Sequence, residues 1–148
     1  GKEGELVFTN LTKTGMPIIR YRTRDLSRLL PGTSRTMRRM DKITGRSDDM
    51  LIIRGVNVFP SQVEEQILTI DSLSPHYMIE VSRENNMDSL CICVEPKAEM
   101  SADDVEAACS QLQQQVKGMI GVSSKIKMQT VGSLPRSEGK AKRVVDSR

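Results

Sequence analysis

From residue 50 onward, the hydrophobic and polar positions predict a small domain with its own core. The apolar runs "MLII" and "VNVF" flank Arg54-Gly55, a pattern typical of a β-hairpin with a short turn. Pro60-Ser61 then opens a helix to about residue 70, in which Ser61 and Glu64 have the spacing of a capping box. This part of the chain therefore predicts a hairpin followed by a capped helix.

The middle of the chain predicts a second hairpin, a second helix and a final strand. Apolar residues alternate with polar ones on both sides of the turn signal Asn85-Asn86, and they are Tyr77, Ile79, Val81, Leu90, Ile92 and Val94. A helix is expected from Ser101, with Asp104 at its third position, and its apolar stripe consists of Val105, Ala108, Cys109, Leu112 and Val116. Alternation returns at residues 125–130. The order hairpin, helix, hairpin, helix, strand predicts an α+β fold of ferredoxin-like type.

The two ends of the chain have a different character. Residues 1–40 read as strands joined by turns, without a helical period and with too few strands to close a sheet. We therefore expect them to be the edge of a larger domain, and the chain to be a piece of a longer one. Residues 131–143 carry Gly, Pro, Ser and several charges, which predicts a mobile loop.

Composition narrows the classes of function. The 148 residues are 37% hydrophobic and 28% charged, enough for one core with a smaller appendage. The 22 basic residues are interleaved with 19 acidic ones, and the net charge of +3 favours an anionic small ligand over a polybasic membrane tether. No apolar run approaches the roughly 20 residues that span a bilayer, and the N-terminus lacks a signal-peptide pattern. We expect a soluble chain with no membrane partner.

The cysteines and the histidine predict no metal site. Cys91, Cys93 and Cys109 are an odd number without zinc-type spacing, and His76 is the single histidine. Cys91 and Cys93 lie two apart in a strand-like run, so they share one face and behave as small apolar residues. This use of cysteine favours a reducing, cytoplasmic location.

Three motifs, in order and in register, carry a resemblance to a known family. They are "IRYRTRDLSRL", "KITGRSDDMLIIRGVNVFPSQVEEQI" and "LPRSEGKAKRVVD". Together they resemble the last third of ligases of the phenylacetate-coenzyme A type, in the adenylate-forming acyl-CoA synthetase superfamily. The resemblance implies an ATP-dependent ligase that turns an aryl acid into an acyl-adenylate and then a CoA thioester, with release of AMP and pyrophosphate. It also implies ATP, Mg²⁺ and coenzyme A as substrates or ion, and a role in phenylacetate catabolism.

The same resemblance divides the chain and supplies its partners. Residues 1–47 become the β-rich end of an N-terminal adenylation domain, and residues 48–148 a mobile C-terminal domain that swings between two faces during the cycle. The partners are the aryl acid, ATP, CoA and the upstream domain of the same polypeptide, and a homodimer stays open. The phosphate loop and the acyl pocket of the family belong to the upstream domain. We therefore expect this chain alone to be inert, and its sequence does not identify the acyl substrate.

Asp25 and Arg46 are the candidate nucleotide-binding residues. Asp25 closes "YRTRD", where an ionised carboxylate can accept hydrogen bonds from two ribose hydroxyls, and the family's ribose-binding Asp falls on it. Arg46 has a planar, permanently charged group suited to ribose oxygens or the α-phosphate, and the family's matching Arg binds the nucleotide. The alternatives are ion pairs of Asp25 with Arg22, Arg24 or Arg28, and of Arg46 with Asp48 or Asp49. The wider superfamily usually has Gly where Arg24 stands, which leaves the role of Arg24 open.

The resemblance also assigns a hinge, a CoA-proximal hairpin and a catalytic residue. Asp48 matches the family's hinge position, where charge keeps a moving backbone solvated. The hairpin that follows lines the pantetheine tunnel with Gly55, Val56 and Asn57, although Gly55 alone reads as an ordinary turn glycine. Lys140 matches the family's catalytic Lys, whose ammonium bridges the substrate carboxylate and the α-phosphate, although a solvated lysine is the alternative. The neighbouring basic residues are interpreted as solvated or as contacts to phosphates, and they are Arg136, Lys142 and Arg143.

Two other classes of protein compete with this interpretation. A free-standing ferredoxin-like regulatory module, which binds a small effector and dimerises through its sheet, leaves the motif at residues 45–67 and Gly139-Lys140 unexplained. Nucleic-acid binding through "RTMRRMDKITGR" lacks a stacking platform, because the aromatic content is 3% and acidic residues are interleaved. The motifs therefore favour the ligase.

Overall fold

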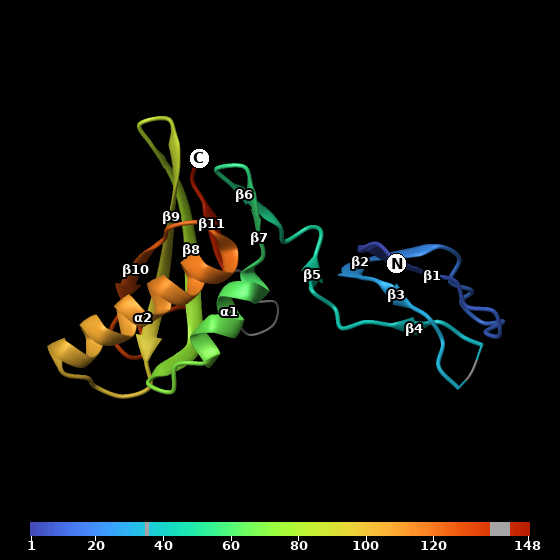
Figure 1. The fold of residues 1–148 in the computed structure, drawn as a ribbon, viewed down its shortest axis with the longest axis horizontal. Coiled ribbons are helices and arrows are strands. Elements are labelled where there is room, and N and C mark those ends of the chain that lie inside the picture. Colours follow the sequence, from blue (N-terminus) through green and yellow to red (C-terminus); the bar gives the residue numbers. More distant parts are fainter. Residues whose placement is uncertain (35, 137–142) are drawn as a thin grey trace. The chain divides into compact units, whose positions relative to one another are not determined.

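The computed structural model describes residues 1–34, 36–136 and 143–148. Contacts between residues divide the chain into two compact units, Gly1–Met50 and Leu51–Arg148, which we call unit 1 and unit 2 (Figure 1). The sequence places a domain boundary after residue 47, and that boundary, with the identity of each part, stays a prediction.

Unit 1 consists of short antiparallel strands, and its described residues form no helix. Its three-stranded sheet has the order β1-β2-β5, with bounds β1 (Gly4–Phe8), β2 (Tyr21–Ser27) and β5 (Gly45–Arg46). A second pair of strands is β3 (Leu29–Leu30) with β4 (Arg39–Met40). None of the hydrophobic side chains described in unit 1 is buried, and 49% to 91% of the surface is exposed at Val7, Phe8, Leu11 and Ile19. This unit therefore has no hydrophobic core of its own among the residues described.

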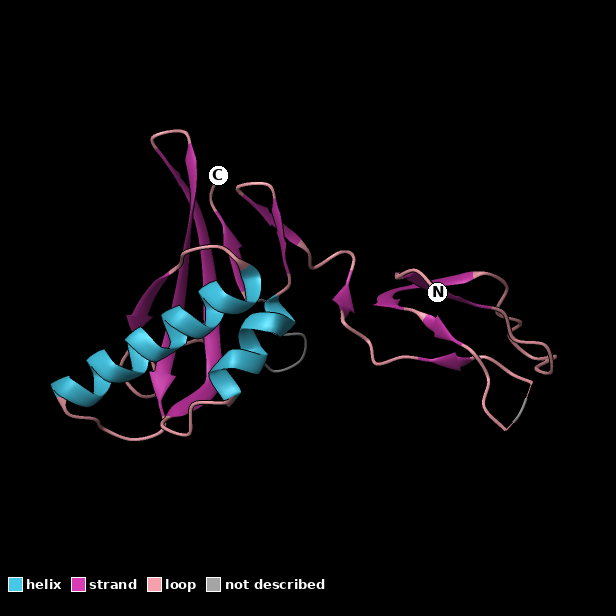
Figure 2. Ribbon diagram, viewed as in Figure 1, coloured by secondary structure: helices cyan, strands magenta, loops and turns pink. Residues whose placement is uncertain are grey.

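Unit 2 shows the expected order of hairpin, helix, hairpin, helix and strand (Figure 2). The first hairpin and helix are β6 (Leu51–Ile53), β7 (Val56–Val58) and α1 (Pro60–Leu68). The elements that follow are β8 (Leu73–Glu84), β9 (Met87–Pro96), α2 (Ala102–Ile120) and β10 (Lys125–Met128). The α+β class is confirmed, and both helices pack on the same side of the β8–β9 hairpin.

The main sheet of unit 2 has four strands in the order β10-β9-β8-β11. β8 and β9 are antiparallel, whereas β10 runs parallel to β9, and β11 (Val144–Asp146) runs parallel to β8. Two features go beyond the expected arrangement: the β6–β7 hairpin forms a separate two-stranded sheet, and β11 supplies one edge of the main sheet. β11 is 3 residues long, so its alternation is too short to stand out in the sequence.

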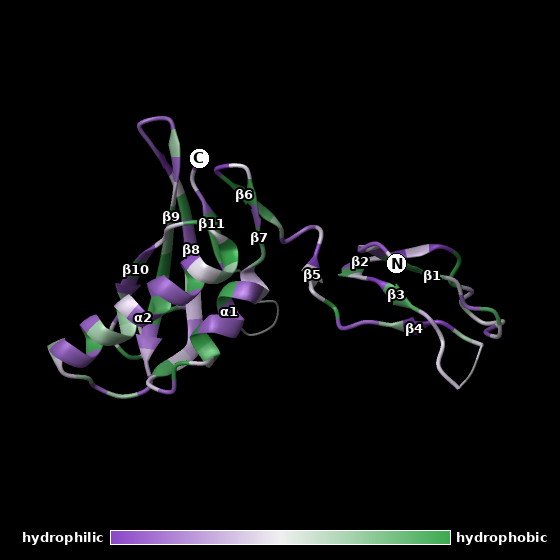
Figure 3. Cartoon of the chain, viewed as in Figure 1, coloured by the Kyte–Doolittle hydropathy of each residue, from purple (hydrophilic) through white to green (hydrophobic). Residues whose placement is uncertain are grey.

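The core of unit 2 lies between one face of the β8–β9 hairpin and the two helices. The sheet residues of this core that are at most 1% exposed include Ile79, Val81, Leu90, Ile92 and Val94. Each helix contributes one apolar stripe, seen as green on otherwise purple helices in Figure 3, with fully buried residues Val63, Ile67, Leu112 and Val116. Full burial of such a side chain stabilises a fold by about 1.5–3 kcal/mol, so this layer dominates the stability of unit 2.

Helix α2 begins with the expected cap at Ser101 and ends with a second cap, at Gly121. The Ser101 hydroxyl accepts a hydrogen bond from the Asp104 N–H at 3.2 Å, which satisfies a donor of the first turn. Gly121 follows the last turn at φ 81°, and its N–H donates to the Lys117 carbonyl. The structure therefore confirms both features from which the sequence predicted this helix, the N-terminal cap and the apolar stripe.

Helix α1 begins two residues earlier than a cap at Ser61 would require, because a cap at Ser61 would place the first helical residue at position 62. The predicted capping box of Ser61 and Glu64 is wrong, because Pro60 already occupies the first helical position. Phe59 is the N-cap, and its N–H donates to the Gln62 side-chain oxygen at 3.1 Å. Proline has a fixed φ and no N–H that would need a partner, so it is favoured at the first position of a helix. A cap at Ser61 would have left Pro60 outside the helix.

We expect hydrogen exchange to separate the two units. Amides of β8, β9 and α2 should exchange slowly, because they belong to a buried core, while amides of β1 to β5 should exchange orders of magnitude faster. The measurement is native-state exchange of the 148-residue chain followed by mass spectrometry. Equal protection in both units would contradict the prediction.

Candidate functional site

Asp25 and Arg46, the two predicted nucleotide residues, lie opposite each other on neighbouring strands. β2 and β5 pair in an antiparallel register that sets Asp25 against Arg46. Arg46 Nη1 lies 3.7 Å from Asp25 Oδ1, and the side chains are 40% and 27% exposed. A guanidinium and a carboxylate are thus held side by side on the surface of unit 1, where both can reach a polar ligand.

Arg46 also binds Asp48, the predicted hinge residue. Its Nε donates to Asp48 Oδ1 at 3.0 Å, and its Nη2 donates to Oδ2 at 2.9 Å. Asp49 lies 3.6 Å from the same guanidinium, and Arg24, at φ 65°, lies 3.6 Å from Asp48. The hydrogen bond from Arg46 is the main cause that lowers the pKa of Asp48, and the same bond raises the pKa of Arg46. Because these groups are in contact with solvent, the pairs are screened and easily exchanged for other partners.

The ion pairs considered as alternatives are observed in part. Arg46 pairs with Asp48 and Asp49, whereas the arginine next to Asp25 is Arg46 itself. The arginines proposed for Asp25 have other partners, since Arg22 binds Glu5 and Arg28 binds Asp41. Ligand-free ion pairing and nucleotide binding are compatible functions for one surface arginine, so these contacts leave the nucleotide role of Arg46 a prediction.

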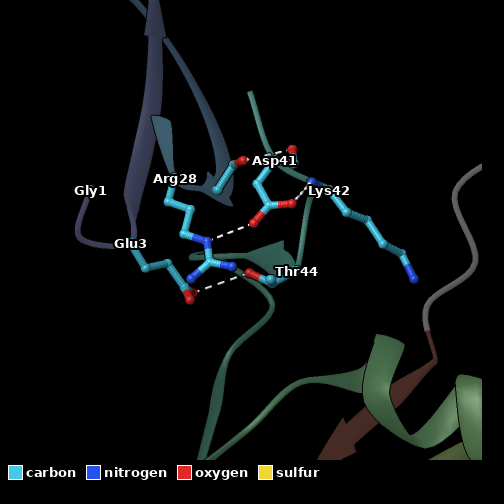
Figure 4. A pocket seen from close by; sticks show the side chains of 7 residues that line it. Gly1, Glu3, Arg28, Asp41, Lys42 and Thr44 are labelled. Carbon is cyan, nitrogen blue, oxygen red and sulfur yellow. Dashed lines mark hydrogen bonds and ion pairs between the residues drawn. The ribbon is translucent and has the colours of Figure 1, made fainter. Parts of the chain in front are cut away.

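A separate pocket of unit 1 has polar walls that bond to one another (Figure 4). Arg28 Nε donates to Asp41 Oδ2 at 2.6 Å, and the Thr44 hydroxyl donates to Glu3 at 3.1 Å. The residues that line this pocket are Gly1, Glu3, Ser27, Arg28, Asp41, Lys42 and Thr44. None of the site residues predicted from the sequence belongs to it.

The β6–β7 hairpin of unit 2 turns at Arg54 and Gly55, which have φ of 49° and 79°. Positive φ at both central residues defines the tight turn that matches the twist of a hairpin, and it favours glycine. A Cβ built on Gly55 meets no atom within 4 Å, so the turn faces open space. Val56 is half-buried against the core, whereas Asn57 and its cross-strand partner Ile52 are exposed. Of the three predicted CoA-proximal residues, Gly55 and Asn57 are therefore accessible, and Val56 supports the hairpin from below.

Two arginines fasten this hairpin to the start of β9. Arg54 Nε donates to the Asp88 carbonyl at 2.7 Å, and Arg148 Nη1 donates to the Ile52 carbonyl at 2.8 Å. Arg148 also binds the Asp88 carboxylate at 3.1 Å. Burial raises the pKa of Asp88, but the hydrogen bonds from Arg83 and Arg148 outweigh it, and the pKa falls below its ordinary value.

Glu95, at the other end of β9, is a buried carboxylate that the sequence did not reveal. It is 0% exposed, and three donors from the chain beyond β10 surround it. Its Oε2 accepts from the Gly132 N–H at 3.3 Å and from Arg136 Nη2 at 2.7 Å, and its Oε1 accepts from the Leu134 N–H. Burial raises the pKa of Glu95, but these hydrogen bonds together lower it below the ordinary value of 4.5.

The described part of the loop at residues 131–143 is therefore anchored, contrary to the prediction of a mobile segment. Leu134 is 8% exposed, and the Arg143 carbonyl accepts from the Ile79 N–H at 2.8 Å where β11 begins. Arg143 stacks 4.8 Å from the centre of the Tyr77 ring, donates to its hydroxyl at 3.2 Å and pairs with Glu64. Arg136 and Arg143 each bind a carboxylate, so neither is simply solvated, and their interpretation as contacts to phosphates stays a prediction. Lys140 and Lys142 lie outside the described residues.

Two thiols of β9, those of half-buried Cys91 and buried Cys93, have an acidic neighbour. Glu80 is paired with Cys91 across β8 and β9, and the ligand atoms of Glu80, Cys91 and Cys93 lie within 4.8 Å of one another. Burial, with Cys91 and Glu80 nearby, raises the pKa of the Cys93 thiol to about 11. The expectation that the chain holds no metal site stays a prediction for this group. Neither helix in the described residues is long and apolar enough to cross a membrane.

Comparison with known protein families identifies this arrangement. The AMP-binding enzyme C-terminal domain family matches residues 55–148, which span nearly all of unit 2. The chain belongs to this family. Within it, the chain is similar to the phenylacetate-coenzyme A ligase of Escherichia coli K12, with 58% identity over 151 residues covering 100% of the chain and 35% of the relative. This likeness confirms the resemblance noted in the three motifs.

Two solved structures of this superfamily resemble the chain. One is 2-hydroxyisobutyryl-CoA ligase in the postadenylation state in complex with 2-HIB-AMP, with a TM-score of 0.86, 32% identity and coverage of 100% of this chain and 33% of that one. The other is a domain of phenylacetate-coenzyme A ligase from Bacteroides vulgatus, with a TM-score of 0.62, 32% identity and coverage of 67% of this chain and 92% of that domain. The chain spans about a third of the length of the E. coli relative and of the 2-hydroxyisobutyryl-CoA ligase.

The contacts of Glu95 predict a local transition in acid. Because its folded pKa lies below 4.5, the stabilisation by its ionised form is complete above that value and is lost as pH falls through the folded pKa. We expect the amide resonances of Gly132 and Leu134 to shift with a midpoint below pH 4.5, followed by NMR. The Glu95→Gln chain is the control and should lack this shift. A midpoint at or above pH 4.5 would contradict the assignment.

Proposed function

We propose that this chain is the C-terminal part of an ATP-dependent aryl-acid CoA ligase of the phenylacetate type. The whole ligase joins an aryl carboxylate to AMP with release of pyrophosphate, and then transfers the acyl group to coenzyme A with release of AMP. The observation that carries this proposal is the register that sets Asp25 against Arg46 in a chain 58% identical to a phenylacetate-coenzyme A ligase. Family membership favours it over a regulatory module or a nucleic-acid-binding protein.

Asp25 and Arg46 together suit a nucleotide. The Asp25 carboxylate accepts hydrogen bonds from the two ribose hydroxyls, and the Arg46 guanidinium binds ribose oxygens or the α-phosphate. Arg46 uses Nε and Nη2 for Asp48, so an anionic phosphate competes with the hinge carboxylate for one side chain. Nucleotide binding and the backbone at the hinge are thereby linked through Arg46.

Unit 2 acts in both half-reactions with different residues. Lys140 supplies the cation for adenylate formation, where a carboxylate attacks a phosphate and two anions must approach each other. The exposed side of the β6–β7 hairpin, with Gly55 and Asn57 and with Val56 beneath, borders the pantetheine arm in thioester formation. Asp48 is the hinge that allows the C-terminal domain to present each group in turn.

Mg²⁺, ATP and coenzyme A act in the whole ligase. Mg²⁺ prefers oxygen ligands, whereas the group of potential metal ligands found among the described residues includes two thiols. We therefore assign the Mg²⁺ that accompanies ATP, with the phosphate loop and the aryl pocket, to the upstream domain. The free thiols of Cys91, Cys93 and Cys109 fit a reducing compartment, and we propose a cytoplasmic location.

The ligase that contains this chain should release AMP when given ATP, CoA and an aryl acid. A panel of phenylacetate, hydroxylated and indolic relatives, and aliphatic acids tests this, and phenylacetate-type acids should be the best substrates. The 148-residue chain alone should release none and should bind ATP only with millimolar Kd, equivalent to about −4 kcal/mol, because it has no phosphate loop. Lack of AMP release with every acid, or micromolar ATP binding by the isolated chain in calorimetry, would refute the proposal.

The two half-reactions should depend on different residues. Lys140→Ala should slow adenylate formation by about a hundred- to a thousandfold and leave thioester formation from supplied acyl-adenylate much less changed, since it removes a cation from the first transition state. Gly55→Leu should do the reverse, because it puts a side chain on the open turn of the hairpin. Single-turnover rates of each half-reaction are the measurement.

Gly121→Leu is the matched control for Gly55→Leu. Gly121 has φ 81°, close to the 79° of Gly55, and a Cβ placed on Gly121 also meets no atom within 4 Å. Both substitutions therefore impose similar backbone strain, but only the one in the hairpin should slow thioester formation selectively. An equal effect of the two variants would show that strain, and not access of the pantetheine arm, is responsible.

A further inference from the structure

We propose that Glu95 and Arg136 are positioning residues for adenylate formation. Their ion pair fixes the point at which the chain enters residues 137–142, the segment that contains Lys140. This inference rests on the proposed function, because it gives the pair a purpose only if Lys140 acts in the first half-reaction. The proposal adds Glu95 and Arg136 to the residues on which adenylate formation depends, although neither of them touches substrate.

The buried carboxylate of Glu95 depends on residues 132–136 for its hydrogen-bond donors. The side chain is 0% exposed, and an ionised carboxylate removed from water is tolerated only when it is paired and hydrogen-bonded. The partners found in the described structure are two backbone N–H groups and Arg136, all from residues 132–136. Releasing the loop would leave a buried charge without donors, so the carboxylate holds this stretch of backbone in one place.

The path from β10 to Arg136 is bonded at successive points. The Gln129 N–H donates to the Val94 carbonyl at 2.8 Å, and the Ser133 N–H closes a turn onto the Thr130 carbonyl at 3.2 Å. Leu134 is buried at 8% exposure directly before Pro135. Arg136 makes the last contact before residues 137–142. Its side chain is 44% exposed, and its Nη2 lies 2.7 Å from Glu95 Oε2.

A second arginine holds the other flank. Arg143 stacks on Tyr77, pairs with Glu64 and bonds through its carbonyl to Ile79. The Tyr77 hydroxyl in turn donates to the Pro60 carbonyl at 3.0 Å, which ties this flank to the start of α1. Both flanks of residues 137–142 are therefore attached to the rigid layer of unit 2.

Chain length turns these anchors into a positional constraint. A residue extends the chain by at most about 3.6 Å, so a residue four positions after Arg136 stays within about 14 Å of it. If the Arg136 anchor is lost, the last side-chain contact before residues 137–142 is removed, while Leu134 stays buried two residues earlier. Misplacement of a catalytic group by about 1 Å can cost a hundredfold in rate, so the direction that the anchor imposes matters more than the tether length.

Arg136 acts through position and not as a second cation. Its Nη2 lies 2.7 Å from Glu95, so its charge is balanced by a buried carboxylate. The pair therefore contributes little net field at the site of reaction, and its loss should change the rate of the step without changing how tightly substrates bind. A role in binding phosphate would instead raise the KM for ATP.

The test uses the whole ligase that contains this chain and three variants of the pair. For Arg136→Met, kcat of adenylate formation should fall by about ten- to a hundredfold, with KM for ATP and acid within about twofold of the parent. Thioester formation from supplied acyl-adenylate should stay within about twofold. Arg136→Lys should restore part of the rate because it keeps the charge pair, and Glu95→Gln should resemble Arg136→Met.

Lys125→Met is the matched control, because it removes a lysine that pairs at 3.5 Å with exposed Glu84 on the same domain. It should leave both half-reactions unchanged. Thermal unfolding is measured for every variant, and Arg136→Met provides the decisive comparison if Glu95→Gln does not fold. An equal slowing of both half-reactions, an effect on KM alone, or an unchanged adenylation rate in Arg136→Met would overturn the inference.

Lys140→Ala, measured in parallel, separates this inference from the proposed function. If Lys140→Ala slows adenylate formation and Arg136→Met does not, the positioning role is wrong and the function stands. If Lys140→Ala leaves adenylate formation unchanged, the catalytic assignment fails and the positioning role fails with it. Selective slowing by both variants supports both proposals.

Discussion

The packing of two helices against one apolar face of the β8–β9 hairpin is the interaction on which unit 2 depends. Ile79, Leu90 and Leu112 are 0% exposed in this layer, and truncation of such a side chain typically costs about 2–5 kcal/mol. That loss is a large share of the roughly 5–15 kcal/mol by which a domain is stable. The smaller elements are attached to this layer: β10 and β11 at its edges, and the β6–β7 hairpin through Ile53 and Val58. The β6–β7 hairpin and the backbone at Arg136 are thus both attached to this layer.

Strand β9 carries a carboxylate near each end, and each one holds a different functional element. Asp88, near its start, binds Arg148 through its carboxylate and Arg54 through its main-chain carbonyl, and so fastens the β6–β7 hairpin. Glu95, near its end, holds the backbone that leads to Lys140. A β-strand within a sheet is a stiff spacer of about 3.3 Å per residue, so it keeps the two attachment points at a constant separation. One domain can therefore offer two working surfaces without reshaping itself between steps.

The local features of unit 2 could be predicted from the sequence, whereas its nonlocal contacts could not. The Ser101 cap, the stripe of α2 and the Asn85-Asn86 turn depend on neighbours within a few residues, and all three are confirmed. The start of α1 differs from the predicted cap, because Pro60 takes the first helical position ahead of the capping-box spacing of Ser61 and Glu64. Glu95 reads as a polar residue at a strand end, and nothing near it in sequence indicates donors from residues 132–136. Likewise the motifs named Asp25 and Arg46, but only strand register shows them face to face.

The different burial of the two groups of ion pairs fits the different tasks proposed for them. Arg46, Asp48 and Arg24 lie at the surface of unit 1, where solvent screens each pair and a phosphate or water can replace a partner. A hinge needs such contacts, because it must change backbone angles many times without losing a packed core. Glu95 is buried, so separating it from its donors leaves an uncompensated charge, and the contact resists exchange. Exchangeable pairs at the proposed hinge and a lasting pair at Arg136 would let the domain move as a body while the backbone at Arg136 keeps its place within it.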